Sequence, residues 1–586
     1  MSKKLLIIIG IPALLLLGGY LYLRFSLESS INKTEKKTGV TQPIVKELGG
    51  KKVSGADLRP LFITKLQQVL SESSNGLYKV SVGDLQPDLL SSSLLLKDVV
   101  LNYDSTVFAV QKKAGTLPDN VFSISFKSLL IEGINLDDAI TSKTMDYKLV
   151  KLVQPRIILI HGKAPEKEMS NEDFAGRFLK QMKKLSIQQL IIEDGTVVVQ
   201  NAANNKKSNQ LNSVSVVMTN ILLDSASRKI RKGILFSETA TIQFKNFVKP
   251  TADGLYNLKI GKVTIREPQQ TVSLANVSFT SPYGRKGFVR KQKFSKELYS
   301  LNTPAVTIAG LNWFTLMNEE ELVADAINME RGSLSIYLDR SLPPKSKMGN
   351  FPNQLLLKLP MKINVAKVNI SNMNFAYSEY NPISQQTGTM YLNKLKLSIK
   401  NVSNNKQNPQ PVIAIGSGLL MNKVPVKANF IFDMAQAKSG KFSAQLKVAG
   451  FDGAVVNPFA MPMGMVKTEE GIVHSAEGKI TGNELKAAGK VFIAYSNLKL
   501  HLLEKDKGEA ALDKKGFTTL VANLFVLKKN NPVKGPDARR EDAEFVRLPE
   551  GGFFTLIWKT ILVGILKTIG APEKMAYKTI NSQAKK

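Results

Sequence analysis

The chain has 586 residues, no cysteine and 43% apolar residues, a composition that excludes disulfides, cysteine nucleophiles and cysteine-ligated metals and argues against a disordered chain. Its formal net charge of +32 favours an anionic partner, either nucleic acid or an acidic membrane surface, with a lysine-rich proteome as the alternative explanation. Because aromatic residues make up only 7%, the basic residues are dispersed and no recognised binding module occurs, we expect no nucleic-acid partner.

A long apolar segment lies near the N-terminus. Residues 5–23 carry no charge, and at about 1.5 Å per residue they can cross a hydrocarbon core of roughly 30 Å. The segment is longer than the apolar region of a signal peptide and lacks a small-residue cleavage site. We therefore predict an uncleaved transmembrane signal anchor at 5–23, preceded by a cytoplasmic stub at 1–4. Basic residues on both sides of the segment leave its orientation open.

A stretch of ten residues recurs 178 positions further along the chain. It reads GLYKVSVGDL at 76–85 and GLYNLKIGKV at 254–263. The similarity continues over roughly 76–225 and 254–405, with offsets between 177 and 181, and a diverged continuation follows. A duplication of this kind predicts stacked modules, because one module alone cannot bury its apolar face.

Within each copy, apolar residues fall at relative positions 0, 2, 5 and 7, as in INVAKVNI at 363–370. A period of two predicts strands with one apolar face. The step from 2 to 5 shifts the phase, and we expect a β-bulge there, with short strands broken by loops as the alternative. Turn-forming residues at 193–195 and 371–372 are expected to follow strands. These patterns predict a mainly β fold built on a long, curved, antiparallel sheet of repeating modules.

Few helices are expected. Candidate helices lie at 170–184, 314–326, 516–527 and 553–569. Four short helices cannot cover the apolar face of so many one-sided strands. A large uncovered apolar face usually marks a binding surface.

No set of residues typical of an enzyme emerges. His161, His474 and His501 are far apart in the sequence and share no ligand spacing. The chain has neither a phosphate-binding loop of the G-x-x-x-x-G-K-[ST] kind nor a G-x-S-x-G nucleophile motif. We therefore predict no catalytic, metal or cofactor site and a protein that is not an enzyme.

The order of these features resembles that of the AsmA-like family, inner-membrane-anchored envelope proteins related to the bridge-like lipid-transfer proteins. The N-terminal anchor and five further segments carry the resemblance: VSVGDLQPDLLSSSLLLKDVVL at 80–101, LSIQQLIIEDGTVVV at 185–199, VNISNMNFAY at 368–377, AAGKVFIAYSNLKLHLL at 487–503, and GGFFTLIWKTILVGILKTIG at 551–570. An Asn530-Asn531-Pro532 turn stands between the last two.

The resemblance implies a β-groove lined with apolar side chains, in which phospholipid tails lie between the inner and outer membranes. It also implies that most of the chain is periplasmic, that a single helix holds it in the inner membrane, and that an outer-membrane or other envelope protein of unknown identity is its partner. On this basis the expected groove lining is Leu94, Leu96, Val99, Leu101, Leu190, Ile192, Val272, Leu274, Val277, Phe279, Val368, Ile370, Leu395 and Leu397.

These features divide the chain into seven expected parts. They are the stub at 1–4, the anchor at 5–23, a linker and entry segment at 24–75, a first β-groove module at 76–253, a second at 254–430, a diverged third β segment at 431–510, and a helical C-terminal cap at 511–586.

Segment 553–569 is apolar on most sides and has two interpretations. It is either a helix that lies in a membrane interface or a helix that caps the end of the sheet. Its expected contact residues are Phe553, Phe554, Ile557, Trp558, Ile561 and Ile565. For the whole chain, we expect a non-enzymatic protein that binds or transfers phospholipid and contributes to outer-membrane biogenesis. The alternative is a membrane-anchored structural or adhesive β protein with a closed core and no lipid.

Overall fold

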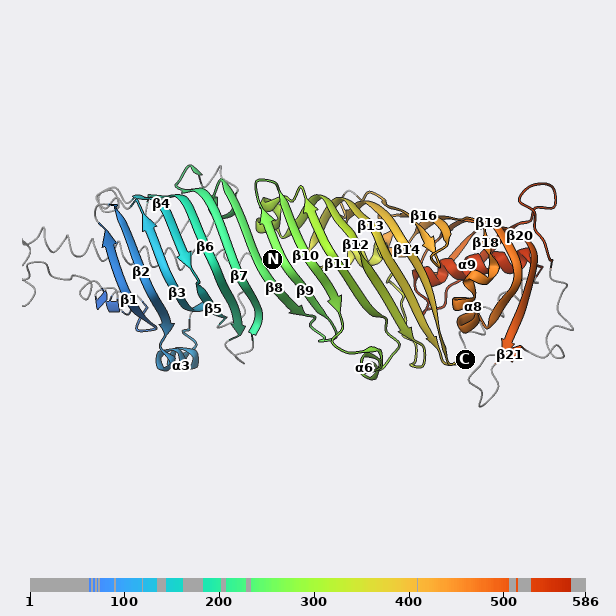
Figure 1. Ribbon diagram of the computed structural model, residues 1–586, viewed down its shortest axis with the longest axis horizontal. Helices are drawn as coiled ribbons and strands as arrows, with labels where there is room; N and C mark the ends of the chain where they lie inside the picture. The colour runs from blue at the N-terminus through green and yellow to red at the C-terminus, as the bar shows by residue number, and fades with distance from the viewer. Residues whose placement is uncertain are drawn as a thin grey trace, which may run out of the picture. The chain divides into compact units, whose positions relative to one another are not determined.

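The computed structural model describes residues 74–570 with gaps at 89–90, 118–119, 134–143, 162–182, 202–206, 228–232, 408, 505–512 and 515–527, and a few positions between 63 and 71. The anchor at 5–23, the helix expected at 516–527 and residues 170–182 of the helix expected at 170–184 lie outside the described residues. The described part is mainly β with few short helices, as the sequence predicts (Figure 1).

The chain forms two compact units. The first holds the residues up to Val248 together with Ile260–Val272 and Trp313–Glu319, and the second holds Lys249–Lys259, Ser273–Asn312 and Glu320–Lys586.

The early strands are β1 (Tyr78–Asp88), β2 (Ser93–Tyr103), β3 (Asn120–Glu132), β4 (Thr144–Val153), β5 (Arg156–His161), β6 (Lys184–Asn201), β7 (Lys207–Leu223), β8 (Thr239–Pro250), β9 (Asn257–Arg266) and β10 (Thr271–Thr280). The later strands are β11 (Leu298–Ala309), β12 (Glu321–Asp339), β13 (Lys362–Asn381), β14 (Gln386–Ser403), β15 (Val412–Leu420), β16 (Val424–Phe432), β17 (Phe442–Val448), β18 (Phe451–Asp452), β19 (Val466–Gly482), β20 (Lys486–Glu504), β21 (Asp513–Lys514) and β22 (Arg540–Val546).

The described helices are short except for the last. They are α3 (Ser105–Ala114), α6 (Arg285–Arg290), α7 (Pro352–Leu357), α8 (Asn457–Gly464) and α9 (Phe553–Thr568), with single turns η2 (Ile234–Phe236), η3 (Thr315–Glu319), η4 (Ala437–Ser439) and η5 (Gly453–Val456). The prediction of a helix at 314–326 is therefore wrong beyond η3, which ends at Glu319. From Glu321 onward the chain is β12, whose pairing with β13 outweighs a weak local preference for helix.

The sheet in each unit is mixed, which corrects the prediction of an antiparallel one. In the first unit β4 and β5 run parallel to β6, whereas β1–β2, β2–β3 and β6–β7 are antiparallel. In the second unit β12 runs parallel to β13, and the remaining pairs from β11 to β20 are antiparallel. A parallel pair needs a crossover of a dozen or more residues, and residues 340–361, which include α7, supply it between β12 and β13.

The strand pairing repeats with the offset of the sequence duplication. Tyr147 of β4 lies opposite Ile187 of β6, and Ala324 of β12 lies opposite Val365 of β13. Positions with a left-handed backbone recur in the same way: Gly76 and Gly254, Ser92 and Gln270, Asp98 and Asn276, Gly133 and Gly310, Gln154 and Arg331, Asp194 and Asn372, Ser213 and Lys394, and Asn220 and Asn401. The described strands therefore form a repeat-like sheet.

The phase shift in the apolar pattern has a different cause from the one expected. In β1 and β2, the register is the same on both sides of the shift, so neither strand carries the extra residue of a bulge. Instead Gly83 stands beside Asp98, whose φ is 48°, and both strands change phase together. A Cβ at Gly83 would lie 3.0 Å from the Cβ of Asp98, which explains the glycine.

True register shifts occur where the sequence predicts turns. The chain does not turn at 193–195 or 371–372, because both segments lie inside the long strands β6 and β13. The register shifts between Ile192 and Gly195, and between Ile370 and Met373. Asp194 and Asn372 have left-handed φ values of 51° and 53°, so these turn-forming residues supply bulge geometry instead.

The repeated Gly-Leu-Tyr has a structural explanation. Gly76 and Gly254 have φ values of 75° and 66°, in the region that favours glycine. The Tyr78 hydroxyl accepts a hydrogen bond from the Phe122 backbone N–H at 3.1 Å, and the Tyr256 hydroxyl accepts one from the Tyr299 N–H at 3.3 Å. Each tyrosine thus ties the start of its copy to a strand more than forty residues later.

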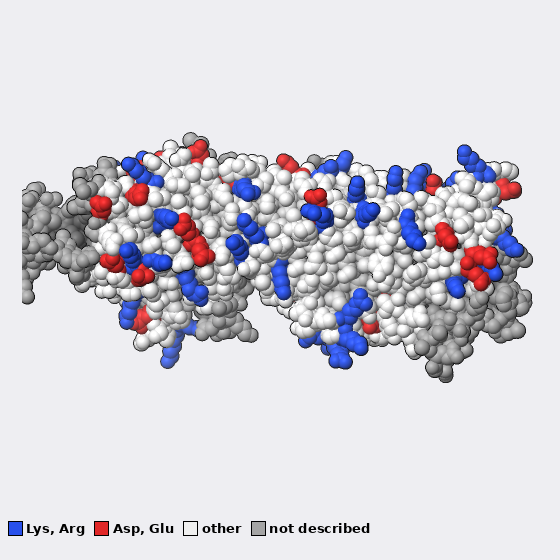
Figure 2. All heavy atoms as spheres, in the orientation of Figure 1, with Lys and Arg blue, Asp and Glu red and all other residues white. Residues whose placement is uncertain are grey.

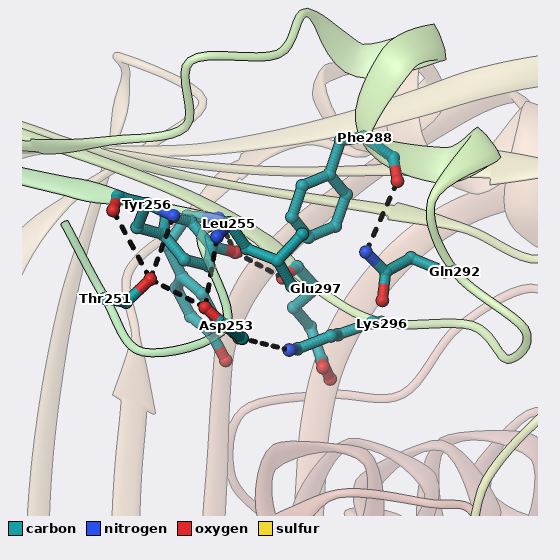
Figure 3. Close-up of polar contacts among 9 residues, drawn as sticks. Thr251, Asp253, Leu255, Tyr256, Phe288, Gln292, Lys296 and Glu297 are labelled. Atoms are coloured by element: carbon teal, nitrogen blue, oxygen red, sulfur yellow. Dashed lines mark hydrogen bonds and ion pairs between the residues drawn. The ribbon is translucent and has the colours of Figure 1, made fainter. Parts of the chain in front are cut away.

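Tyr256 is part of a polar cluster in the loop before β9 (Figure 3). The Tyr256 hydroxyl donates to the Glu297 backbone oxygen at 3.0 Å, and its ring stacks on Phe279 with centroids 4.7 Å apart. In the preceding turn, the Thr251 hydroxyl accepts from the Tyr256 N–H at 3.1 Å and donates to Asp253 at 2.6 Å. These contacts fix the loop before β9 and require no ligand.

Candidate functional site

Cross-strand pairing in the second unit places a set of apolar residues on one side of the sheet. Val368 of β13 lies opposite Ile327 of β12 and Ile399 of β14, and Ile370 lies opposite Met329 and Leu397. Because side chains alternate along a strand, these residues share a face. The open apolar face, as we name it, consists of Ile327, Met329, Leu334, Val368, Ile370, Phe375, Leu392, Leu395 and Leu397, all of them partly exposed.

Helix α9 covers the continuation of this face over the later strands (Figure 1). It packs on β19, β20 and β22, and its buried residues belong to one hydrophobic cluster with Val412, Phe432, Ala444, Ile480 and Val491. Leu397 of the open apolar face packs against the same core, as does Ile399, two residues further along β14. The apolar surface is therefore closed by a helix over the later strands and partly exposed over β12–β14.

The N-terminal end of α9 is held by an aromatic cluster. The ring of Phe553 lies 4.9 Å from that of Phe442, 5.2 Å from that of Phe351 and 5.4 Å from that of Phe432. Near the other end, Gly564 allows close packing, because a Cβ there would lie 2.4 Å from the Cβ of Val491. The described helix packs as a cap on the sheet.

The outer side of α9 is also apolar. Phe554 is 69% exposed and Trp558 is 48% exposed, and they stand four residues apart on one side of the helix. The Phe554 ring is 6.1 Å from that of Phe430, a residue of β16 on the covered face. Among the expected contact residues, Phe553 and Ile557 are buried, Ile561 and Ile565 are partly buried, and Phe554 and Trp558 are exposed.

The structure separates the expected groove lining into two groups. Leu94, Leu96, Val99, Leu101, Leu190 and Ile192 are only 1–6% exposed, and Val272 and Val277 are also buried. Leu274, Phe279, Val368, Ile370, Leu395 and Leu397 are partly exposed. The accessible part of the expected lining thus lies in the second group, and four of its residues belong to the open apolar face.

A polar cluster at one end of the open apolar face was not anticipated from the sequence. Tyr377 and Glu379 continue the alternation of Phe375 on β13, so they stand on the same side of the sheet. The Tyr377 hydroxyl donates to Glu379 at 2.5 Å, and Arg340 forms an ion pair with Glu379 at 3.2 Å. Burial, and then the Glu379 charge, raise the pKa of Tyr377. In the sequence, this cluster could have been recognised from Tyr377 and Glu379, which continue the two-residue spacing of an otherwise apolar strand face.

The loop after β12 is fixed to the approach to α9. Arg547 is buried and donates hydrogen bonds to the backbone oxygens of Lys347, Glu484 and Gly551. Its guanidinium also lies 4.5 Å from the centre of the Phe351 ring. Burial lowers the pKa of Arg547. The Lys347 amine forms an ion pair with Glu297, just before β11.

The histidines form no common site in the described residues. The His474 ring nitrogen Nε2 lies 3.1 Å from the Ser496 hydroxyl, and His501 contacts Glu469 on the neighbouring strand. An open pocket includes His474, Ser496 and Asn531, but Asn531 is committed to backbone groups of Ile493 and Arg539. Among the residues that the structure describes, no group of three or more histidine, aspartate or glutamate side chains could hold a metal ion.

Basic side chains are dispersed on the face that Figure 2 shows. Lysine and arginine are scattered there with aspartate and glutamate among them, and they do not gather into one basic patch.

Within the described part of the chain, no helix is long and apolar enough to cross a membrane.

Glu267, in the first unit, is a partly buried acid whose ionisation is coupled to stability. Its Oε1 accepts from the Ile234 N–H at 2.9 Å, whereas its Oε2 is buried with no hydrogen-bond partner. Burial raises the pKa of Glu267 to about 7. The folded state therefore holds the proton more tightly than the unfolded state, and this contribution to stability is lost as the pH rises from about 4.5 through 7.

We expect Glu267→Gln to remove this pH dependence. Between pH 5 and pH 8, the wild-type unfolding free energy should fall relative to that of the variant by about 2 kcal/mol, a value reduced for partial solvent screening. Urea unfolding can be followed by Trp313, which belongs to the first unit, in a Trp558→Phe background. Glu238→Gln, at an exposed glutamate nearby, is the matched control. Parallel pH profiles for wild type and Glu267→Gln would contradict the assignment.

The chain matches no protein-family model, and no curated protein matches it.

Proposed function

We propose that the open apolar face holds acyl chains, and that the protein is a non-enzymatic lipid-binding or lipid-transfer protein. The observation that supports this most directly is the partial exposure of aliphatic and aromatic side chains on adjacent strands β12, β13 and β14. Soluble proteins seldom leave contiguous apolar surface exposed unless it binds something. A surface of aliphatic side chains without a dominant polar group suits a flexible hydrocarbon chain.

The location and wider role belong to the same proposal. The uncharged segment 5–23 would hold the chain in the inner membrane, with its bulk in the periplasm, and the bound lipid would be phospholipid on its way to the outer membrane. This part rests on the resemblance to the AsmA-like family and on the apolar segment.

A structural protein with a closed core is the second candidate. The observation that favours it is the burial of the expected lining residues in the first unit, such as Leu94 and Val99, at 1% exposure each. If the closed-core hypothesis holds, the apolar residues of both copies of the repeat stabilise the sheet and bind no lipid.

Lipid analysis of the purified protein tests the proposal. The full-length chain would be extracted in a non-ionic detergent, and its bound lipid quantified by mass spectrometry. The control is residues 1–30 fused to an unrelated soluble domain, which carries only the lipid that surrounds the anchor. We expect the full chain to retain at least one additional phospholipid per molecule. Equal lipid content in the two proteins would refute lipid binding and favour the closed core.

A further inference from the structure

In the second unit, the side of the sheet opposite the open apolar face carries lysines on β13, β14, β16 and β17. Lys396 and Lys400 alternate with Leu397 on β14, so they stand on the other side of the sheet from the open apolar face. Cross-strand pairing extends this side to the neighbouring strands. We name it the lysine side and define it by five exposed residues, Lys367, Lys396, Lys400, Lys427 and Lys447.

Two pairs of these lysines stand directly opposite each other on neighbouring strands. Lys367 of β13 pairs with Lys400 of β14, and Lys427 of β16 pairs with Lys447 of β17. Residues in such positions have Cβ atoms about 5 Å apart, and like charges there destabilise a sheet. An arrangement that costs folding free energy is typical of a surface that binds something of opposite charge.

Acidic residues are missing from the strands that carry most of these lysines. Strands β14, β15, β16 and β17 contain no aspartate or glutamate. On the flanking strands, Glu330 of β12 lies opposite Ser371, and Glu477 of β19 forms an ion pair with Lys447 at 3.6 Å. Among the described residues, Lys367, Lys400 and Lys427 form no ion pair. These three exposed ammonium groups therefore have no counter-charge in the described part of the chain.

Aliphatic side chains lie among the lysines. Ile415 of β15 is 52% exposed and Ile431 of β16 is 38% exposed. Ile413 of β15 lies between Lys400 and Ile431 on its two neighbouring strands. Interfaces between proteins are usually depleted of lysine and enriched in arginine, and strands β13–β17 contain no arginine. Lysines around exposed aliphatic residues instead suit a surface that lies on an acidic membrane.

We propose that the lysine side docks on a membrane surface that contains anionic phospholipid, with Ile415 and Ile431 at the level of the headgroups. The ammonium groups would contact lipid phosphates, and the headgroup charge would relieve the repulsion within the two lysine pairs. This contact uses the side of the sheet away from the open apolar face, so it does not depend on acyl chains lying there. It adds an anionic lipid surface as a partner of the second unit.

Site-specific fluorescence tests the inference. The chain has no cysteine, so Ile415→Cys provides a single site for the fluorophore NBD, whose emission rises in an apolar environment. The full-length protein in phosphatidylcholine nanodiscs is mixed with vesicles of phosphatidylcholine, or of an equal mixture of phosphatidylcholine and phosphatidylglycerol. We expect NBD emission to rise with the anionic vesicles, with binding at least about tenfold tighter than to the neutral ones. High salt should abolish this preference.

Lys400→Gln/Lys427→Gln in the labelled protein should weaken binding to the anionic vesicles about 25-fold, at about fivefold for each lysine. Its melting temperature should not fall, because each substitution removes one charge of a like-charged pair. The matched control is Lys293→Gln/Lys345→Gln, which removes two exposed lysines from loops of the same unit. We expect this control to bind within about threefold of the parent protein, because charges far from the contact are screened.

Four results would overturn the inference. Equal weakening in the two double variants would show that binding follows total charge and not the lysine side. Vesicle binding, measured by flotation, without a change in NBD emission would place the contact elsewhere on the chain. Equal binding to both kinds of vesicle would exclude anionic lipid as the partner. If poly-glutamate raises NBD emission and vesicles do not, the occupant is an acidic polypeptide.

Discussion

Ile370→Asp should leave the protein folded and lower its bound lipid at least tenfold. Ile370 lies in the middle of the open apolar face, between Met329 and Leu397 on the neighbouring strands. An ionised carboxylate against acyl chains costs several kcal/mol, and each 1.4 kcal/mol corresponds to a factor of about ten in affinity. Because Ile370 is partly exposed in the free protein, its carboxylate can remain hydrated when no lipid is bound.

The matched control is Asn374→Asp, an exposed position on the other side of the same strand. It adds the same charge to β13 and should keep full lipid content. Circular dichroism and lipid mass spectrometry on the two variants distinguish the candidate functions. If β13 belongs to a closed core, Ile370→Asp should unfold the second unit and Asn374→Asp should not. A folded Ile370→Asp protein with wild-type lipid content would show that chains do not lie on this face.

The other large effect is expected on α9. Phe553→Ala should destabilise the second unit by about 3–5 kcal/mol, the usual cost of deleting a buried phenylalanine side chain. Phe553 is 5% exposed and contacts the rings of Phe351, Phe432 and Phe442, so its loss leaves a cavity at the start of the helix. Urea unfolding followed by Trp558 in the Trp313→Phe background measures the change.

Phe554→Ala provides the comparison on the next residue of the same helix. Because Phe554 is 69% exposed, we expect its removal to change the unfolding free energy by less than about 1 kcal/mol. If α9 instead packs through its outer side, the order of the two effects would reverse. A similar small effect for both variants would mean that the helix does not cap the sheet through this cluster.

Sequence periodicity predicted the strands well and their connections poorly. Alternation over 185–199 and 363–370 identified β6 and β13, because the period of two reflects the pleat directly. The same reasoning ended those strands too early, since Asp194 and Asn372 favour turns and bulges alike and only the pairing partner decides between them. The parallel pairing of β13 was missed, although the 22-residue gap at 340–361 is too long for a hairpin.

The candidate site was predictable only in its apolar part. Val368, Ile370, Leu395 and Leu397 followed from alternation, whereas the degree to which each is covered depends on helices that pack from far along the chain. The polar cluster of Arg340, Tyr377 and Glu379 could not be assembled from the sequence, because Arg340 follows β12 whereas Tyr377 and Glu379 belong to β13. Phe553 and Phe554 likewise looked equivalent, and only the packing of α9 separates them.

The mixed pairing of β13 has a consequence for the order of folding. On one side, β13 and β14 are joined by a tight hairpin, with Asn381 opposite Gln386. On the other side, β12 and β13 are joined through the crossover at 340–361. Loop closure is easier and faster for the short connection, so the hairpin should form first and then dock on β12. Until the hairpin docks, the edge of β12 that β13 will cover stays unpaired along a strand of 19 residues. Such unpaired edges promote aggregation.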